Sequence, residues 1–432
     1  MNKLAGPTNS NTSVGRTSFV LLLVIALLNT MGMTIIIPLV PFLTLPYLAH
    51  PTNLAAVVGW LTAAYGLCQL IAAPGLGVLS DRFGRRPILF ICLLGSALGY
   101  LIFGLGSALW LLFLGRIIDG LTGGNISVLF GYIADITEPE DRGKYFGMLG
   151  GAAGVGSLIG PALGGLLATI NDRVPFLAAA GLLLLTLFWG YFLLPESLDK
   201  EHRIPSISVS ELNPLKQLAS AFCWANVRWL LLAWFLYALP VSMLQTTLTV
   251  LMKDSVGFNA TQAGLVVTLV GAVDILVQGV LVGWFLAILG KIRLGLIALV
   301  LVSISYLVLG SIAFLAIPLL LLLIGIILFA GSGSLVENAL RGLLSEMVGQ
   351  NEQGRVNGVT QSLQSLGWIV GPLVGGFVYT AWGPFQAYAS ASFITVLAIL
   401  CLWIALPFLQ RRQVKEQTLS EQEAPLLSSE ED

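Results

Sequence analysis

The chain has few charged residues and only two histidines. Charged residues make up 10% of its 432 residues, against about 25% in ordinary soluble domains, so most of the chain cannot face water. The four cysteines show neither metal-ligand spacing nor a disulfide pattern. His50 and His202 lie outside the long apolar segments, which excludes a histidine relay within them. We therefore expect no metal and no cofactor.

Long apolar segments dominate what is present. The chain is 56% hydrophobic, with a mean hydropathy of +0.90. Crossing the hydrocarbon core of a bilayer takes about 20 apolar residues as a helix, and a helix that is apolar on nearly all sides cannot pack into a soluble core. Twelve segments qualify: 18–43, 57–80, 87–106, 109–136, 144–168, 174–194, 229–252, 262–289, 295–316, 318–347, 355–379 and 385–409. Because helices satisfy their own backbone groups in lipid, the sequence predicts an all-α polytopic membrane protein with twelve transmembrane helices.

The basic residues are unequally distributed between the two sides of these segments. When the loops are assigned to alternate sides, 17 of the 21 lysines and arginines fall on one side and two on the other, and the remaining two lie within segments. Positively charged loops stay in the cytoplasm, so we expect both termini there.

The apolar pattern breaks once in the middle of the chain, which suggests two halves. The expected parts are an N-terminal tail at 1–17, a six-helix bundle at 18–194, a cytoplasmic linker at 195–228, a second six-helix bundle at 229–410 and an acidic cytoplasmic tail at 411–432. The Glu- and Ser-rich composition from Glu416 onward predicts disorder in that tail.

The two halves also resemble each other in sequence. Gly-Ser-Leu-Ile-Gly-Pro-Ala-Leu-Gly-Gly at 156–165 recurs as Gly-Trp-Ile-Val-Gly-Pro-Leu-Val-Gly-Gly at 367–376, an offset of 211 residues that also relates Asp135 to Glu346. Gly77 and Gly84 have counterparts 206 residues later. These offsets far exceed the 20–50 residues of repeat arrays, so they indicate a duplicated multi-helix unit, as in many membrane transporters.

The connection between the second and third segments carries a charged motif, Gly77-Val-Leu-Ser-Asp-Arg-Phe-Gly-Arg-Arg-Pro87. So tight a turn needs the backbone freedom of Gly84, and Pro87 suits the first turn of the next helix. Asp81 is costly at the end of an apolar helix unless it is paired or faces a helix N-terminus. The alternative, that the basic residues only set topology, explains the arginines but not the whole motif.

These motifs resemble those of the Major Facilitator Superfamily over essentially the full chain apart from the two tails. Residues 77–87 are similar to its loop 2–3 pattern, and 283–293 to a degenerate second copy with Ala287 in place of the acid. Arg116-Ile-Ile-Asp119-Gly resembles the helix-4 pattern, and 156–165 resembles the helix-5 motif of drug–proton antiporters. The segments 29–41 and 194–197 resemble the tetracycline-efflux branch.

The resemblance implies two pseudo-symmetric six-helix bundles and a conformational latch. Asp81 would face the N-terminus of helix 11 near Gly354, and Arg85 would bridge to Asp135, holding the halves together in the outward-facing state. The implied latch residues are Gly77, Asp81, Arg82, Gly84, Arg85, Arg86 and Asp135.

The helix-5 motif consists of Gly156, Gly160, Pro161, Gly164 and Gly165. Glycines four apart share one helix face and let two backbones approach closely, while the proline frees a carbonyl and can kink the helix. Two interpretations stay open: close packing alone, or a kinked interface on which the halves rock during alternating access.

Ionisable residues within spans are functional hypotheses by default. Arg116 and Asp119 are spaced to neutralise each other, as are Glu337 and Arg341. Asp274 has only Gln278 one turn on, so it is the first candidate for a proton carrier, ahead of Asp119 and Glu337. The alternative is that Asp274 pairs with Arg116 or Arg341 across the bundle, or faces the headgroups.

The substrate site is expected near mid-membrane, among polar and aromatic residues of the spans. The candidates are Asn29, Asn125, Tyr237, Gln245, Gln278, Asn338, Gln361 and Gln364. Asn29 stands where the tetracycline-efflux branch usually carries an acid, and an amide cannot take up a proton. Few charges among many apolar groups indicate an amphipathic or weakly charged substrate.

Together these features predict a proton-coupled exporter of drug- or tetracycline-like molecules, a multidrug-efflux type of antiporter in a bacterial inner membrane. Its expected partners are a small-molecule substrate, protons and the lipid bilayer; we expect a monomer and no nucleic acid. The alternatives are a facilitator or uptake transporter of a metabolite without proton antiport, and a non-transporting sensor. The predicted spans contain no nucleophile–base pair, so an enzyme is not favoured. The sequence contains no GxxxxGK[ST] motif, so ATP-driven transport is not supported.

Overall fold

The computed structural model describes residues 10–138, 141–198, 203, 227–315, 317–348 and 352–427. Every regular element in these ranges is helical. The elements are α1 (Ser10–Ile36), η1 (Ile37–Leu39), α2 (Val40–Thr44), η2 (Leu45–Tyr47), η3 (Pro51–Asn53), α3 (Leu54–Phe83), α4 (Arg85–Leu105), α5 (Leu109–Thr122), α6 (Asn125–Ile136), α7 (Arg142–Ala168), α8 (Val174–Leu193), α10 (Arg228–Val256), α11 (Ala260–Leu276), η6 (Val277–Leu281), α12 (Val282–Ser311), α13 (Pro318–Glu346), α14 (Gln353–Trp382) and α15 (Pro384–Leu427).

The helices have the length and surface of membrane spans. Ten stretches of the described residues are long and apolar enough to cross a bilayer. One of them, Ala260–Ser311, has 52 residues and turns at Gly290, where φ is 69°, so it contains two crossing lengths. Large apolar side chains such as Ile71 and Leu166 are more than 60% exposed, as expected of a surface that faces lipid. The all-α polytopic prediction is confirmed, and α14 as a twelfth span stays a prediction.

Two backbone irregularities interrupt spans that the sequence had suggested to be regular. The span 109–136 divides into α5 and α6 at Gly123 and Gly124, and Gln69 Nε2 donates to the Gly123 carbonyl oxygen at 3.1 Å. A carbonyl freed in this way within a span needs a donor when no water is present. The second irregularity is η6, a five-residue π-helix directly after α11.

The C-terminal segment was expected to be disordered from Glu416 onward, and this prediction was wrong. Helix α15 continues as far as Leu427. Its continuation is rich in Gln, Glu, Lys and Arg, which all favour helix. The charged composition of the segment predicts disorder, but that argument leaves out its helix propensity.

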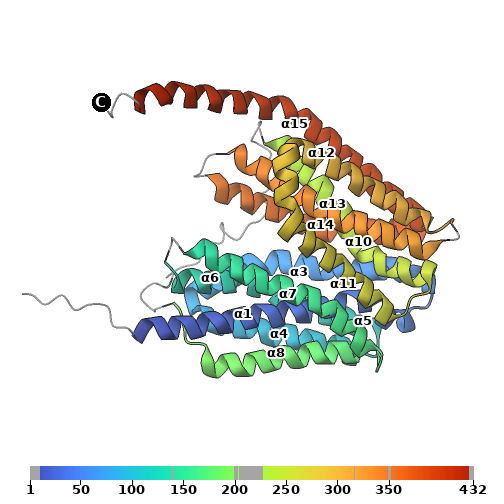
Figure 1. The fold of residues 1–432 in the computed structure, drawn as a ribbon. Helices are drawn as coiled ribbons and strands as arrows, with labels where there is room; N and C mark the ends of the chain where they lie inside the picture. Colours follow the sequence, from blue (N-terminus) through green and yellow to red (C-terminus); the bar gives the residue numbers. More distant parts are fainter. Residues whose placement is uncertain are drawn as a thin grey trace, which may run out of the picture. The chain divides into compact units, whose positions relative to one another are not determined.

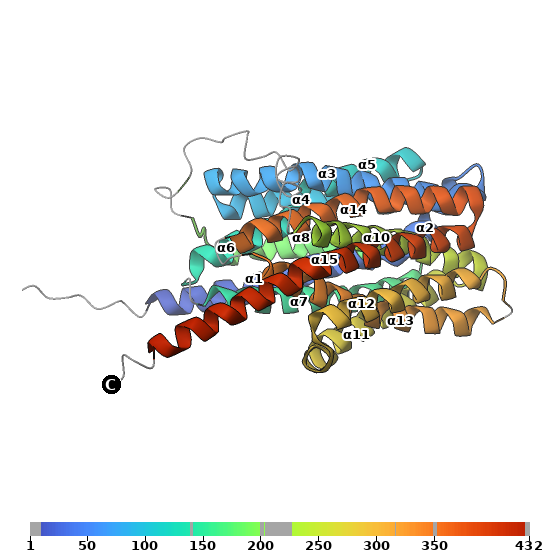
Figure 2. The same cartoon turned by 90° about the horizontal axis from the view of Figure 1, so that it is seen from above.

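The described contacts divide the chain into two compact units, Met1–Asn213 with Thr246–Ala272, and Pro214–Gln245 with Val273–Asp432. In the first unit α1 packs against α7 and α8, and α4 packs against α5 and α8 (Figure 1). In the second unit α12 packs against α13 and α15 (Figure 2). The expected bundle boundaries stay predictions, and most of the linker, with Cys223, lies outside the described residues.

Glycine ladders hold one helix pair together in each unit. A Cβ atom on Gly156 would meet the Leu27 carbonyl oxygen and lie 3.1 Å from the Met31 nitrogen of α1. A Cβ atom on Gly375 would lie 3.0 Å from Met243 Cβ of α10. The ladders of α7 and α14 therefore lie directly against α1 and α10.

A similar hydroxyl contact accompanies both ladders. Thr34 Oγ1 lies 3.3 Å from the Gly156 carbonyl oxygen, with the Thr30 carbonyl oxygen as its nearer acceptor, and Ser242 Oγ donates to the Gly367 carbonyl oxygen at 2.7 Å. Gly156 and Gly367 are related by the offset of 211. The duplication inferred from the sequence is thus repeated as a helix contact with matched hydroxyl groups.

We expect Gly156→Ala to lower thermal stability, because the added methyl group meets backbone atoms of α1 that cannot move aside; overpacking of this kind costs about 1–3 kcal/mol. Gly154→Ala is the control on the same helix, since a Cβ there meets nothing within 4 Å and alanine favours helix by up to about 1 kcal/mol. Melting of the purified protein in micelles measures both. Equal melting temperatures for the two variants would contradict the ladder contact.

Candidate functional site

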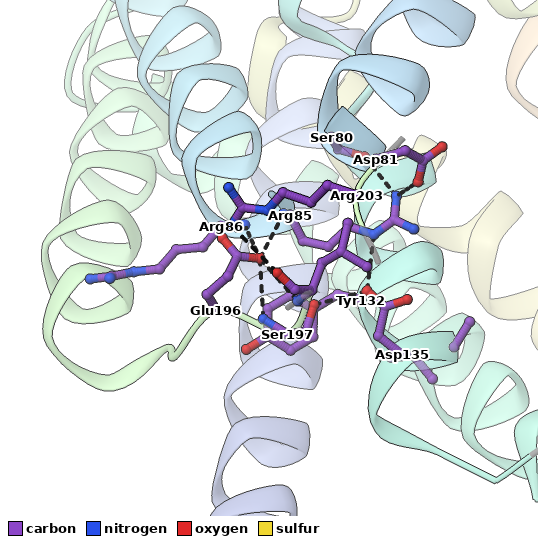
Figure 3. A network of polar contacts seen from close by, with 12 residues as sticks. Ser80, Asp81, Arg85, Arg86, Tyr132, Asp135, Glu196, Ser197 and Arg203 are labelled. Atoms are coloured by element: carbon purple, nitrogen blue, oxygen red, sulfur yellow. Dashed lines mark hydrogen bonds and ion pairs between the residues drawn. The ribbon is translucent and has the colours of Figure 1, made fainter. Parts of the chain in front are cut away.

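The turn between α3 and α4 forms a polar network that we call the Arg85 cluster (Figure 3). Its members are Ser80, Asp81, Arg85, Asp135, Glu196 and Ser197. Arg85 Nε donates to Asp135 Oδ2 at 3.0 Å, so the expected Arg85–Asp135 pair is present. The same guanidinium donates to Ser80 Oγ at 2.7 Å and forms an ion pair with Asp81. Arg85 thereby ties the end of α3 to the end of α6.

Glu196 connects the segment after α8 to this cluster. Helix α4 begins after Gly84, whose φ is 107° and which has no side chain to cap the helix. Glu196 Oε1 supplies the acceptor, taking a hydrogen bond from the Arg85 backbone nitrogen at 2.8 Å. A carboxylate at a helix N-terminus also interacts favourably with the helix dipole. Ser197 Oγ donates to Asp135 Oδ2 at 2.9 Å, so three connections of the bundle meet here.

Gly131 makes room for the arginine. A Cβ atom at Gly131 would lie 2.8 Å from Arg85 Cζ, so a larger residue there would force the guanidinium to shift from its path across α6 to Asp135. The two other arginines of the motif lie differently: Arg82 is exposed, and the Arg86 guanidinium lies 5.2 Å from the Tyr191 ring centroid. The Gly77 carbonyl oxygen accepts a hydrogen bond from Ser80 Oγ at 2.6 Å.

A reduced version of the cluster recurs in the second unit. Gly290 has a positive φ of 69°, as Gly84 does, and Lys291 forms an ion pair with Glu346. A Cβ atom at Gly342 would lie 3.1 Å from Lys291 Cδ, and Gly342 follows Gly131 by the same 211 residues. Ala287 replaces the acid of the first copy. The second unit thus retains the turn and its cation, the glycine that the cation passes, and the acid with which it pairs. It lacks a counterpart of Asp81.

The helix-5 motif has two contact faces within the first unit. The ladder Gly156, Gly160 and Gly164 faces α1, which agrees with the close-packing interpretation for these three. Gly165 faces a different helix: a Cβ atom there would lie 3.3 Å from the Gly264 Cα atom of α11. The Pro161 carbonyl oxygen would be 2.6 Å from a Cβ atom on Gly264. Pro161 and Gly165 therefore form the backbone contact with α11.

Four of the five intramembrane charges examined in the sequence form ion pairs. Arg116 Nη1 lies 3.6 Å from Asp119 Oδ2, and the guanidinium is 5.2 Å from the Tyr65 ring centroid and 5.6 Å from that of Phe103. Arg341 forms an ion pair with Glu337, while its guanidinium lies 5.4 Å from the Trp234 ring centroid. Both predicted local pairs are confirmed.

Asp274 is the fifth charge, and no lysine or arginine of the described residues forms an ion pair with it. Its carboxylate instead contacts neutral groups: Ser334 Oγ of α13 donates to Oδ1, and Gln278 Nε2 lies 3.2 Å from each carboxylate oxygen. Asn338 Nδ2 donates to the Ser334 carbonyl oxygen at 2.8 Å. We call Asp274, Gln278, Ser334 and Asn338 the Asp274 cluster. Gln278 lies in the π-helix η6, a rare form that is frequent at functional sites.

The structure brings together only some of the expected substrate residues. Gln278 and Asn338 belong to the Asp274 cluster, and the Tyr237 hydroxyl donates nearby to the Gly333 carbonyl oxygen at 2.9 Å. Asn29 and Asn125 are buried and bind each other, with Nδ2 of Asn125 2.6 Å from Oδ1 of Asn29. This pair joins α1 to α6. The remaining candidates are exposed or half-exposed: Gln245, Gln361 and Gln364.

Several residues of these sites were missed by reasoning from the sequence. Ser334 had no signal, because a serine in a helix commonly bonds its own i−4 carbonyl. Glu196 had been noted only as part of a resemblance. Gly131 and Gly342 did carry a signal, the offset of 211 that relates other residues of the two halves.

Comparisons with known proteins agree on one family. The family model described as Major Facilitator Superfamily matches residues 22–372 and 230–430. "Tetracycline resistance protein, class C" of Escherichia coli is 34% identical over 360 residues, 82% of this chain and 87% of that protein. "Multidrug resistance protein 2" of Bacillus subtilis (strain 168) is 31% identical, covering 84% of this chain and 89% of that protein.

Solved structures share the fold. The human organic anion transporter MFSD10 (TETRAN) superposes with a TM-score of 0.64 at 25% identity, covering 90% of this chain and 99% of that one. A D-xylose-proton symporter superposes with a TM-score of 0.70 at 19% identity, covering 90% and 97%. The second similarity supports the fold alone.

We expect Glu196→Ala to loosen the start of α4, because the Arg85 amide loses its carboxylate acceptor; losing a helix cap costs about 1 kcal/mol. Hydrogen exchange at the amides of Arg85 and Arg86 should accelerate about fivefold. Glu196→Gln keeps an acceptor oxygen and should accelerate exchange less. Glu138→Ala, which removes an acid at the end of α6, is the control. Unchanged exchange in Glu196→Ala would show that Glu196 does not cap the helix.

Proposed function

We propose that this chain, which belongs to the Major Facilitator Superfamily, exports amphipathic small molecules in exchange for protons. The chain is an integral, multi-pass membrane protein, and its family consists of transporters that carry solutes without covalent chemistry. The proposal adds the direction, the coupling ion and the residue that carries the proton. It also places the protein in a bacterial inner membrane with both termini in the cytoplasm, following the distribution of basic residues.

The observation that carries the proposal is the environment of Asp274. In a membrane span a carboxylate is costly without a counter-ion, and a group that can lose this cost by taking up a proton is suited to reversible protonation. Asp119 and Glu337 each have an arginine within ion-pair distance, whereas Asp274 is bound by a hydroxyl and an amide. A neutral surround lets Asp274 change its charge without leaving a cation unpaired.

The substrate class follows from the residues around this carboxylate and from the relatives. Gln278 is exposed beside Asp274, and α13 adds the Glu337–Arg341 pair, whose guanidinium lies over the buried Trp234. The relatives named above are tetracycline and multidrug resistance proteins. An amphipathic molecule with few charges, drug- or tetracycline-like, fits a site of this composition.

The Arg85 cluster supplies a latch that opens and closes during alternating access. Its ion pairs are breakable, because pairs near the surface contribute about 1 kcal/mol or less each. The cluster joins the ends of α3, α6 and α8 at one point. Asp81, which Arg85 holds, is the group that would reach the N-terminus of α14 near Gly354; that contact stays a prediction. Gly165 and Gly264 provide a second contact. Because neither glycine has a side chain, the backbones of α7 and α11 approach closely there and can move past each other.

Gradient-driven transport tests the assignment of Asp274. We expect Asp274→Asn in proteoliposomes to abolish proton movement on substrate addition and to reduce accumulation to the level seen without a pH gradient. Exchange of labelled for unlabelled substrate should persist, because an amide can hydrogen-bond substrate but cannot carry a proton. A panel of lipophilic cations and tetracycline-like compounds serves as substrates, and Asp254→Asn, the same change at an exposed acid of α10, serves as the matched control.

Other results of these transport assays would change the proton carrier or the type of transport. Proton movement that survives in Asp274→Asn and disappears in Asp119→Asn or Glu337→Gln would move the carrier to that residue. Substrate movement without any proton signal in the unsubstituted protein would contradict antiport and leave a facilitator, the function that Asn29 in place of a helix-1 acid favours.

A further inference from the structure

Ser334 is a buried serine of α13 whose hydroxyl group has two acceptors. Its side chain is 3% exposed. The hydroxyl lies 3.0 Å from the Ala330 carbonyl oxygen one turn earlier and also contacts Oδ1 of Asp274 on α11. Since a hydroxyl has one proton and two lone pairs, it cannot donate to both oxygens at once.

The two acceptors correspond to the two charge states of Asp274. When Asp274 is ionised, the hydroxyl proton points to the carboxylate, and a hydrogen bond to a charged acceptor is the stronger of the two. When Asp274 is protonated, its own O–H can donate to Ser334 Oγ, and the hydroxyl proton turns to the Ala330 carbonyl oxygen. Both states are fully hydrogen-bonded, and only the hydroxyl proton has to rotate.

The other polar groups near Asp274 do not take this role. On α13, Glu337 and Arg341 form an ion pair with each other. On α10, the Tyr237 hydroxyl donates to the Gly333 carbonyl oxygen. Gln278 donates to the carboxylate through its amide nitrogen, and it would have to turn its whole amide group over to accept the proton of a neutral carboxyl group through its oxygen.

We propose that Ser334 is the positioning residue of the proton carrier, a hydroxyl that pairs with Asp274 in both its charged and its neutral state and sets the pH at which the two interchange. The inference rests on the proposed function, in which Asp274 carries the proton. It adds a residue on a second helix, so that loading the carrier is linked to the contact between α11 and α13.

The pH profile of substrate-driven proton movement tests the inference. Ser334→Ala removes the donor to the ionised state, so we expect the midpoint of the profile to move upward by about one pH unit. Ser334→Thr keeps the hydroxyl and should restore the original midpoint. Ser334→Cys, which keeps the volume but donates weakly, should shift the midpoint in the same direction by less, and it replaces the alanine variant should that variant fail to fold.

Ser332 provides a matched control on the same helix. It is equally buried, at 3% exposed, and its hydroxyl also bonds the carbonyl oxygen four residues earlier, that of Leu328, but it does not contact Asp274 in the structure. We expect Ser332→Ala to leave the midpoint unchanged.

The outcomes separate this inference from the function on which it rests. A Ser334→Ala profile that coincides with the original, or an equal shift in Ser334→Thr or Ser332→Ala, would overturn the role of Ser334 while Asp274 remains the carrier. Proton movement that persists in Asp274→Asn would overturn both proposals, since the profile would then report another group.

Discussion

The cost of an unpaired charge in the hydrocarbon core constrains most of this structure. An ionised side chain at the centre of a membrane helix costs about 2.5–3.5 kcal/mol on insertion scales, so such groups persist only where something offsets that cost. Arg116 and Asp119 offset it by pairing between two aromatic rings, and Glu337 and Arg341 by pairing one turn apart beside Trp234. Among the described residues Asp274 has only neutral donors, and for this reason the proposed mechanism assigns the proton to it.

Duplication explains where the two halves agree, and loss of residues explains where they differ. Both have a glycine ladder against another helix, with a hydroxyl in contact with the carbonyl of the first ladder glycine. In both halves a glycine with a positive φ, Gly84 or Gly290, is followed by a basic residue. The side chain of that residue passes a second glycine and forms an ion pair with an acid. The second half has lost the acid that corresponds to Asp81, with Ala287 in its place. In the proposed mechanism one turn therefore acts as the latch, while the other retains only a local ion pair.

The sequence was sufficient for features that depend on composition and local spacing. Hydropathy located the helices, and spacings of three and four residues identified both ion pairs of the spans. The helix break at Gly123 and Gly124 was missed, because the carbonyl it frees is bonded by a distant residue, Gln69; the π-helix at Val277–Leu281 was missed as well. Glu196 and Ser334 were missed for the same reason: each acts through a partner more than 50 residues away. The end of α15 was mispredicted because charge was weighed above helix propensity.

Infrared difference spectroscopy measures directly whether Asp274 changes its protonation state when substrate binds. A protonated carboxyl group has a carbonyl stretching band that disappears on ionisation. We expect substrate addition to the purified protein to remove such a band, and we expect no band to be lost in Asp274→Asn. Loss of the same band in Asp274→Asn, or no loss in the unsubstituted protein although substrate binds, would contradict the assignment of Asp274 as the proton carrier.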